Sequence, residues 1–157
     1  MDDRLFRNAM SKFATGVTVI TTEHESQVHG MTANAFMSVS LDPKLIMISV
    51  GEKARMLQKI KTSNSFVVNI LAEQQESVSR LFAGQSDEKR ELEFDWVDEQ
   101  PLIKDAIASV VCEVYDSQVV GDHTVFIGEV KDVVLKEGKP LVFYSGKYGN
   151  YDEGTSI

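Results

Sequence analysis

The chain has 157 residues, of which 43% are hydrophobic and 25% are charged, values ordinary for a soluble globular domain with a buried core. Its net charge of -8 argues against a surface that binds nucleic acid or an anionic membrane. We predict one domain over residues 1–157.

The N-terminus and the cysteine content predict the compartment. The start Met1-Asp2-Asp3-Arg4 lacks the basic segment and apolar run of a signal peptide. No apolar stretch reaches the roughly 18 residues that a membrane span needs. Cys112, the single cysteine, cannot form an internal disulfide, and its apolar neighbours favour a buried structural thiol over a nucleophile. These features predict a cytoplasmic protein.

The first half of the chain begins with a predicted helix and continues with short strands. The helix is capped by Asp2 or Asp3, ends at Gly16, and places one apolar face at Leu5, Phe6, Ala9, Met10 and Phe13. β-Branched and alternating segments predict strands over residues 17–22, 28–36 and 45–50. A short helix over residues 54–61 follows.

The second half alternates in the same way and ends in two long strands. We predict a strand over 65–71, a helix over 74–82, and a polar surface loop over 85–100 that serves as a lid or a packing arm. Strands over 107–120 and 124–135 and a last strand over 141–145 precede a loosely held tail. Some seven strands with only short helices predict a closed β-barrel decorated by helices.

Several common catalytic motifs are missing from the sequence. It contains no Gly-x-Gly-x-x-Gly after a strand, no phosphate-binding P-loop and no Gly-x-Ser-x-Gly elbow. The three histidines lack the spacing of metal ligands. Acid–base groups are scarce in apolar settings, which favours a cofactor that carries the chemistry.

A polar row follows the predicted strand near residue 30. In extended chain, residues two or four apart face one side of a sheet, which applies to Thr32, Asn34, Ser38 and Ser40. Beside the small Ala33 and Ala35, such a row suits a flat heteroaromatic ring whose edge needs hydrogen bonds. A solvated sheet face is the alternative interpretation.

A second candidate segment runs from Ser49 to Arg55, where a strand ends and a helix begins. Amides at a helix start bind phosphate, and Lys53 and Arg55 add positive charge. The alternative is a charged helix start with solvent-facing side chains.

Three further segments contain residues that a ligand site uses. The Gly121-Asp122-His123 turn places an ionisable ring at a strand start, although an ordinary surface histidine is the alternative. Phe82-Ala83-Gly84-Gln85 either closes over a ligand or only stops a helix. Tyr144-Ser145-Gly146-Lys147-Tyr148 is either a stacking site or a strand end.

Taken together, these segments resemble the flavin reductase-like family of FMN-binding split barrels. The resemblance spans residues 5 to 151 in family order. Its motifs are Phe13-Ala14-Thr15-Gly16-Val17-Thr18-Val19-Ile20-Thr21, Gly30-Met31-Thr32-Ala33-Asn34-Ala35-Phe36, Ser38-Val39-Ser40, Phe82-Ala83-Gly84, Gly121-Asp122-His123-Thr124, Gly128-Glu129-Val130 and Pro140-Leu141-Val142-Phe143-Tyr144 with Gly146 and Tyr148. Within the family, the chain is most similar to the reductase component of two-component phenol hydroxylase.

The resemblance implies a mainly β homodimer with short helices, in which NADH reduces a flavin that then serves a separate oxygenase component. It implies that the flavin contacts Thr32, Ala33, Asn34, Ala35, Phe36, Ser38, Val39 and Gln85, with its phosphates near Lys53, Ala54 and Arg55. It further implies that NADH contacts Gly121, Asp122, His123, Tyr144, Ser145, Gly146 and Lys147. The phenol hydroxylase type favours FAD, with FMN as the alternative.

One departure from the family concerns the phosphate site. Many relatives carry a Ser- or Arg-rich run where this chain has Gly51-Glu52-Lys53-Ala54-Arg55. Hydride transfer between stacked rings needs little proton transfer by the protein, so His123 is interpreted as a positioning group rather than an obligatory base. A flavin carrier without turnover and a structural or interaction protein are the competing function classes.

Overall fold

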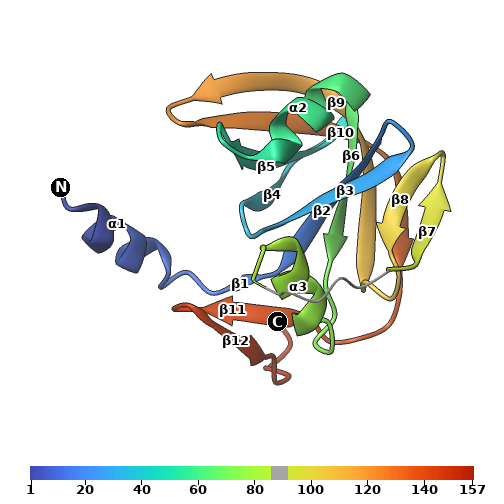
Figure 1. The fold of residues 1–157 in the computed structure, drawn as a ribbon. Helices are drawn as coiled ribbons and strands as arrows, with labels where there is room; N and C mark the ends of the chain where they lie inside the picture. Colours follow the sequence, from blue (N-terminus) through green and yellow to red (C-terminus); the bar gives the residue numbers. More distant parts are fainter. Residues whose placement is uncertain (86–91) are drawn as a thin grey trace.

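A seven-stranded antiparallel sheet forms the centre of the computed structural model, which describes residues 1–85 and 92–157 (Figure 1). Its strand order is β3-β2-β6-β9-β10-β5-β4. The bounds are β2 (Thr18–His24), β3 (Gln27–Ala33), β4 (Phe36–Leu41), β5 (Lys44–Gly51), β6 (Ser65–Ile70), β9 (Ala108–Val120) and β10 (His123–Leu135). Because β3 and β4 are consecutive in the chain yet form opposite edges, the sheet curls back on itself and leaves the barrel split between them.

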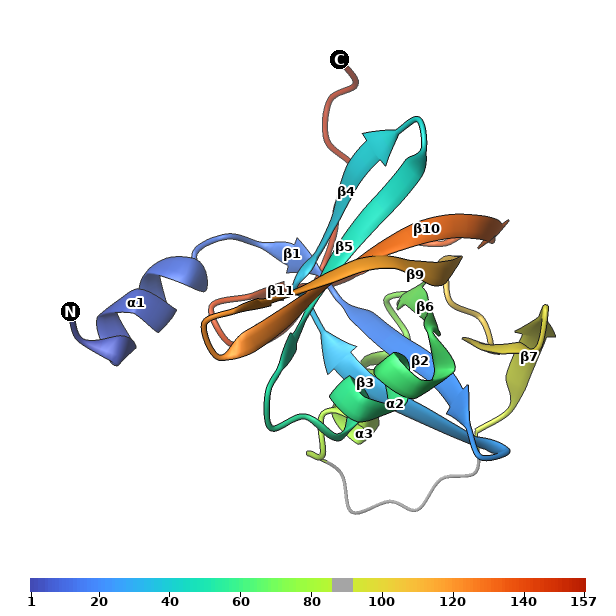
Figure 2. The same ribbon diagram turned by 90° about the horizontal axis from the view of Figure 1, so that it is seen from above.

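Two small sheets and three helices surround this barrel (Figures 1 and 2). The first small sheet has the order β1-β11-β12, and the second is the hairpin β7–β8. Their bounds are β1 (Thr15–Gly16), β11 (Leu141–Tyr144), β12 (Lys147–Asn150), β7 (Phe94–Val97) and β8 (Gln100–Ile103). The helices are α1 (Asp3–Met10), α2 (Arg55–Ser63) and α3 (Glu76–Phe82). The predicted mainly β fold with short helices is confirmed.

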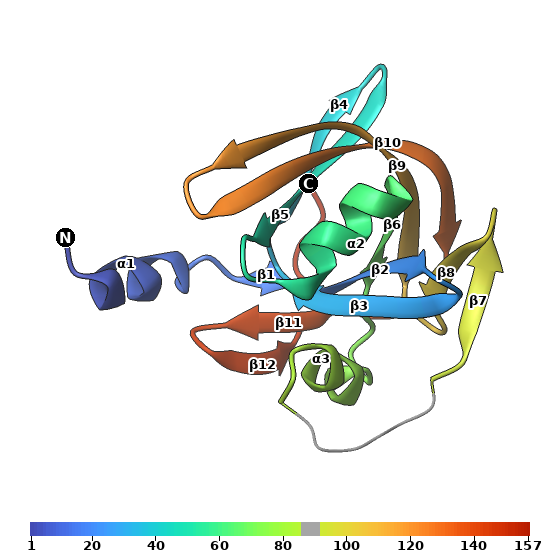
Figure 3. The ribbon, with the colours of Figure 1, turned by 45° about the horizontal axis from the view of Figure 1, so that its top comes forward.

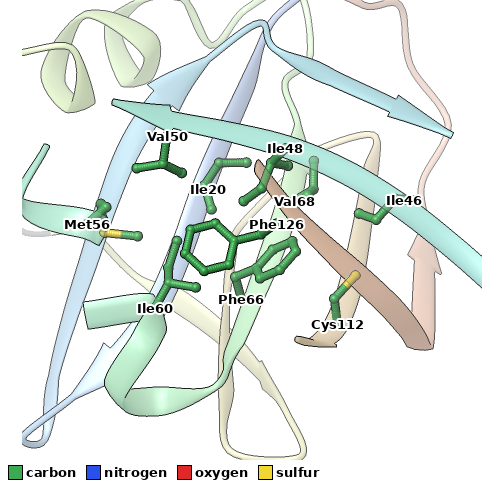
Figure 4. Packing of buried hydrophobic residues seen from close by; sticks show 10 residues of the cluster. All are labelled: Ile20, Ile46, Ile48, Val50, Met56, Ile60, Phe66, Val68, Cys112 and Phe126. Carbon is green, nitrogen blue, oxygen red and sulfur yellow. The ribbon is translucent and has the colours of Figure 1, made fainter. Parts of the chain in front are cut away.

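The main hydrophobic core lies between the barrel strands and α2. Alternate residues of β5 point inward, and α2 adds Met56 and Ile60 from one helical face (Figure 4). Phe66 and Phe126 fill the centre of this cluster. A Cβ atom at Gly128 would lie 2.6 Å from Cζ of Phe66, so the core packs directly against that glycine. The core therefore leaves no room for a larger residue at position 128.

A buried polar network joins β8 to the barrel. The Asn69 side chain, which is 0% exposed, donates to the Val19 carbonyl at 2.9 Å and to Thr21 Oγ1 at 3.0 Å. Its Oδ1 accepts from the Ile103 N–H at 2.9 Å and from the Ser109 hydroxyl at 2.8 Å. Each polar atom of the amide thus has two partners, which satisfies a group that is costly to bury unpaired.

The N-terminal helix is shorter than predicted and stands apart from the barrel (Figure 3). It begins with Asp2 as its cap, as expected, but ends at Met10, so Gly16 does not terminate it and Phe13 lies outside it. None of its residues is buried, and Phe13 is 80% exposed. No helix in the described part of the chain is long and apolar enough to cross a membrane.

Three other predicted boundaries were wrong. The predicted strand over 28–36 breaks after Ala33, because Asn34 and Ala35 carry the chain from one edge of the split barrel to the other. The segment 85–100, predicted as a loop, contains β7, while its residues 86–91 lie outside the described residues. The tail predicted to be loose contains β12, which pairs with β11 and so gains the ladder bonds that its polar sequence did not reveal.

Candidate functional site

The split between β3 and β4 forms the first part of the candidate site. Asn34 and Ala35 are exposed in this gap, and the Ser49 N–H donates to the Ala35 carbonyl at 3.3 Å. Thr18 Oγ1 donates to the Ala33 carbonyl at 2.6 Å, which fixes the end of β3. Edge strands present unpaired N–H and C=O groups, so this gap offers main-chain hydrogen bonds to a planar ligand.

The single polar row predicted along this segment is wrong. Thr32 belongs to β3, whereas Ser38 and Ser40 belong to β4, with a β-bulge between them. Thr32 Oγ1 donates to the Ser79 carbonyl at 2.6 Å, so this hydroxyl ties β3 to α3. The chain crosses the split at Asn34, and this tertiary feature removes the strict alternation that the prediction assumed.

The start of α2 forms the second part of the site. Its N-cap residue, Ala54, makes no side-chain capping bond, and the first turn carries no acidic residue. By contrast, Asp2 caps α1 by accepting from the Arg4 N–H at 3.1 Å. The uncapped N–H groups of α2, with the exposed Lys53 and Arg55 beside them, have the chemistry of a phosphate site.

The Gly121-Asp122-His123 turn lies directly beside the start of α2. In the β10–β5 ladder His123 is opposite Gly51, and the Glu52 N–H donates to the Asp122 carbonyl at 2.9 Å. Nδ1 of His123 is 2.7 Å from Oδ1 of Asp122, and this hydrogen bond lowers the pKa of the Asp122 carboxyl. The His123 side chain is 48% exposed, so the imidazole is accessible to a ligand.

The second predicted nucleotide turn, Tyr144–Lys147, lies at the tip of the β11–β12 hairpin. Its Ser145 N–H donates to the Ser11 carbonyl at 3.0 Å, and the Lys12 Nζ is 5.9 Å from the centroid of the Tyr144 ring. The turn therefore contacts the segment after α1. The β9–β10 and β11–β12 hairpins both extend toward the side on which α1 lies (Figure 3).

Two cavities open at this split. The larger has a volume of about 910 Å³ and lies between α1 and the sheet, with a mainly apolar lining that includes Phe6, Phe13, Met37 and Met47. The smaller, about 170 Å³, is lined by Val17, Thr32, Ala33, Asn34, Ser79, Ala83, Gln85, Phe143 and Tyr148. Asn34 and Phe143 line both, so the two cavities adjoin at the predicted flavin segment.

Sequence reasoning assigned no site role to α1 or Ser79, both of which line these cavities. The amphipathic spacing of α1 was visible in the sequence, but it is the usual signal for a helix packed on its own core. Ser79 gave no signal, because its place depends on how α3 packs. Tyr148, which lines the smaller cavity, belongs to the segment that was predicted to be either a stacking site or a strand end.

The chemistry of the lining fits a flavin nucleotide. Main-chain edges and aromatic rings at the cavities match a planar ring system. The basic start of α2, which follows β5 and lies outside both cavity linings, matches the phosphates. Burial raises the pKa of the Cys112 thiol to about 12, so this cysteine is not a nucleophile near neutral pH. The expectation of a buried structural thiol agrees with its 2% exposure.

Comparison with known proteins finds similarity to flavin reductases. The family model described as "Flavin reductase like domain" matches residues 10–152. An NADH-dependent flavin reductase from Rhodococcus sp is 44% identical over 145 residues, covering 90% of this chain and 82% of the relative. The reductase component of 4-hydroxyphenylacetate 3-monooxygenase from Thermus thermophilus is 38% identical over 144 residues, covering 91% of this chain and 93% of the relative.

A solved structure has the same backbone fold as this chain along nearly its whole length. The flavin reductase PheA2 in its native state superposes with a TM-score of 0.95 and 56% sequence identity. The match covers 98% of this chain and 100% of that chain.

Proposed function

Because the chain belongs to the flavin reductase like domain family, we propose that it is the NADH:flavin oxidoreductase of a two-component aromatic monooxygenase. It reduces flavin with NADH and supplies the reduced flavin to a separate oxygenase component. The observation that carries the proposal is the 56% identity and 0.95 TM-score to a flavin reductase over 98% of the chain. The relative that serves 4-hydroxyphenylacetate hydroxylation supports a phenol-type partner reaction.

The flavin, when bound, supplies the hydride-accepting chemistry. The residues of the chain bind and orient it. Main-chain groups of residues 32–36 contact the ring edge, with Ser38 and Val39 beside them on β4, and they stabilise negative charge on the ring. Gln85, at the end of α3, is a further contact. The uncapped amides of α2, with Lys53, Ala54 and Arg55, hold the phosphates.

NADH binds at the two hairpin tips, Gly121–His123 and Tyr144–Lys147. His123 orients the nucleotide by hydrogen bonding, and the carboxylate of Asp122, 2.7 Å from Nδ1, fixes the ring. The exposed position of Asp122 keeps this pair in contact with water, so it is suited to positioning rather than to a tuned proton transfer. FAD is the preferred flavin because the phenol hydroxylase type that the chain resembles uses it, with FMN as the alternative.

The active form is a homodimer whose interface covers α1 and β4. Leu5, Phe6, Met10 and Phe13 are 63%, 53%, 57% and 80% exposed, and Met37 and Leu41 on β4 are 51% and 81% exposed. A helix of eight residues is marginal in water without packing, so its apolar face needs a partner surface. A second copy provides the same surface by symmetry.

The test is NADH and NADPH oxidation by the purified chain with FAD, FMN and riboflavin in turn. We expect NADH oxidation that depends on added flavin and is fastest with FAD. Flavin binding without turnover would instead indicate a carrier or electron store. A chain that neither binds flavin nor oxidises NADH would overturn the proposal.

The role of His123 is tested with the variant His123→Ala. We expect a raised KM for NADH or slower flavin reduction, with flavin binding largely kept. His24→Ala, on the distant β2–β3 hairpin, is the matched control. Unchanged steady-state kinetics in His123→Ala would remove this residue from the site.

A further inference from the structure

The chain crosses the split of the barrel at Asn34 and Ala35, between the end of β3 and the start of β4. Three consecutive carbonyl groups at this crossing accept hydrogen bonds from within the chain. The bonds run to the Ala33 carbonyl from Thr18 Oγ1 at 2.6 Å, to the Asn34 carbonyl from the Phe36 N–H at 3.0 Å and to the Ala35 carbonyl from the Ser49 N–H at 3.3 Å. The carbonyl groups of the crossing are therefore fixed.

The amide groups of the same crossing are left without acceptors. Within the part of the chain that the structure describes, neither the Asn34 N–H nor the Ala35 N–H donates a hydrogen bond. Asn34 lines both cavities, and Ala35 lines the larger one. Two N–H donors are thus held at the candidate site, and a ligand can use them without first breaking a bond inside the protein.

The geometry of the peptide group connects the fixed carbonyls to the unpaired amides. The peptide bond between Ala33 and Asn34 is trans and planar, so its C=O and its N–H point in opposite directions. The hydrogen bond to the Ala33 carbonyl therefore determines the direction of the Asn34 N–H. Among the described residues, Thr18 is the only one whose side chain donates to a carbonyl of the crossing, since the other two donors are main-chain groups.

The Thr18 side chain is itself held firmly. It is 4% exposed and lies on β2, opposite Ala33 of β3 on one side and Ile70 of β6 on the other. Its β-branched side chain has few rotamers, and the distance of 2.6 Å lies at the short end of the range for O–H···O hydrogen bonds. A strand that is paired on both edges thus controls the orientation of the peptide at the open edge of the barrel.

We propose that Thr18 is a positioning residue for the flavin ring, because its hydroxyl holds the Ala33–Asn34 peptide so that the Asn34 N–H donates to the ring edge. This inference rests on the proposed function, in which main-chain groups of residues 32–36 contact that edge. Reduction adds negative charge to the flavin ring, and a donor that is oriented beforehand stabilises this charge without reorganisation. Thr18 therefore favours the binding of reduced flavin over that of oxidised flavin.

The experiment compares wild type with Thr18→Val, which replaces the hydroxyl with a methyl group and keeps the β-branched shape. The Kd of oxidised FAD and the Kd of FAD reduced with dithionite are measured by anaerobic titration. We expect the Kd of oxidised FAD to rise about twofold and that of reduced FAD about tenfold, because hydrogen bonds to charged groups are the stronger ones. The fivefold difference corresponds to a fall of about 20 mV in the two-electron potential of bound FAD.

Thr21→Val is the matched control. Thr21 lies on the same strand, is 0% exposed, and donates to the Pro101 carbonyl at the same distance of 2.6 Å. Pro101 belongs to β8, and Thr21 lines neither of the two cavities. We expect Thr21→Val to lower the free energy of unfolding at least as much as Thr18→Val does and to leave both FAD Kd values unchanged. Equal changes of these Kd values in the two variants would show a purely structural role for Thr18 and overturn the proposal.

Thr18→Ser and Thr18→Ala form a second pair, which differs only in the hydroxyl and serves as the test if Thr18→Val fails to fold. We expect Thr18→Ser to keep the Kd of reduced FAD within about threefold of the wild-type value, because its hydroxyl still reaches the Ala33 carbonyl. Thr18→Ala should raise that Kd about tenfold. Equal Kd values of reduced FAD in these two variants would also overturn the proposal.

The outcomes for Thr18 and for the proposed function differ. A wild type that binds FAD without oxidising NADH would overturn the proposed function, while the titrations with dithionite-reduced FAD still test Thr18. A wild type that oxidises NADH with FAD, and whose two Kd values equal those of Thr18→Val, would overturn the role of Thr18 alone. A wild type that binds no flavin would overturn both.

Discussion

The closed side of the barrel, around Asn69, and the open side, between β3 and β4, differ in how completely their groups are paired. Asn69 is 0% exposed and gives every polar atom of its side chain a partner. On the open side Asn34 is exposed, and the Thr15 hydroxyl is buried without a partner among the described residues. The apolar side chains follow the same division, since Phe66 is 0% and Phe13 is 80% exposed.

This difference shows how the molecule combines stability with binding. The closed side contains the packing and hydrogen bonds that fix the fold, so changes there should act on the free energy of unfolding. The open side leaves main-chain edges, basic side chains and apolar surface exposed, and there we propose that ligands and a second copy bind. Changes there should act on binding and assembly while the fold persists.

The largest effect is expected at Asn69. The variant Asn69→Leu leaves the Ile103 N–H, the Ser109 hydroxyl and the Val19 carbonyl without this side-chain partner in the core. We expect a loss of about 3 to 4 kcal/mol in the free energy of unfolding, measured by urea denaturation. Folded protein should keep the wild-type flavin Kd, and a changed Kd with unchanged stability would contradict the division between the two sides.

The next effect is expected at Gly128. In Gly128→Ala the new methyl would lie 2.6 Å from Phe66 Cζ and 2.9 Å from Cys112 Cβ, so the core must shift. We expect a destabilisation of about 2 kcal/mol in the same denaturation experiment. Gly149→Ala is the matched control, because its Cβ meets no atom within 4 Å. Equal stability of the two variants would show that the core is looser than described.

A substitution on the open side should reverse the pattern. Phe13→Ser removes an aromatic ring that is 80% exposed, so the free energy of unfolding of one chain should change by less than about 0.5 kcal/mol. We expect loss of the homodimer, measured by light scattering after size-exclusion chromatography. Trp96→Ser, 53% exposed on β7, controls for general loss of surface aromatics and should leave assembly intact. A dimeric Phe13→Ser variant would argue against this interface.

The smallest effect concerns pH. Burial, followed by the charge of Lys59, lowers the pKa of His29 on β3 from its ordinary 6.5. The unfolded chain then binds the proton more readily, so this residue contributes stability that is present above about pH 6.5 and declines as pH falls toward the folded pKa. Urea denaturation of wild type and His29→Gln between about pH 7 and pH 5 measures it. The free energies of unfolding of wild type and His29→Gln should converge at low pH. Parallel plots of these free energies against pH would contradict the lowered pKa of His29.

Local sequence predicted most barrel strands, because β-branched and alternating runs depend on nearby residues. The β-branched run at 17–22 and the two long strands joined at Gly121-Asp122 appear as β2, β9 and β10. Strand β12 and the hairpin β7–β8 escaped prediction, since polar strands gain their order from a pairing partner. The site residues taken from the resemblance stay predictions, as does the single-domain organisation.

By itself, the sequence determined the fold class, the family and which segments supply main-chain edges, basic residues and the His123 turn, because each depends on residue types in a fixed order. The tertiary structure decided what these segments meet. It placed His123 opposite Gly51 and interrupted the predicted polar row at Asn34. It used the Thr32 hydroxyl in a hydrogen bond to the Ser79 carbonyl. It also brought Tyr148 to the wall of a pocket, since contacts between residues 69 positions apart arise only when the barrel closes.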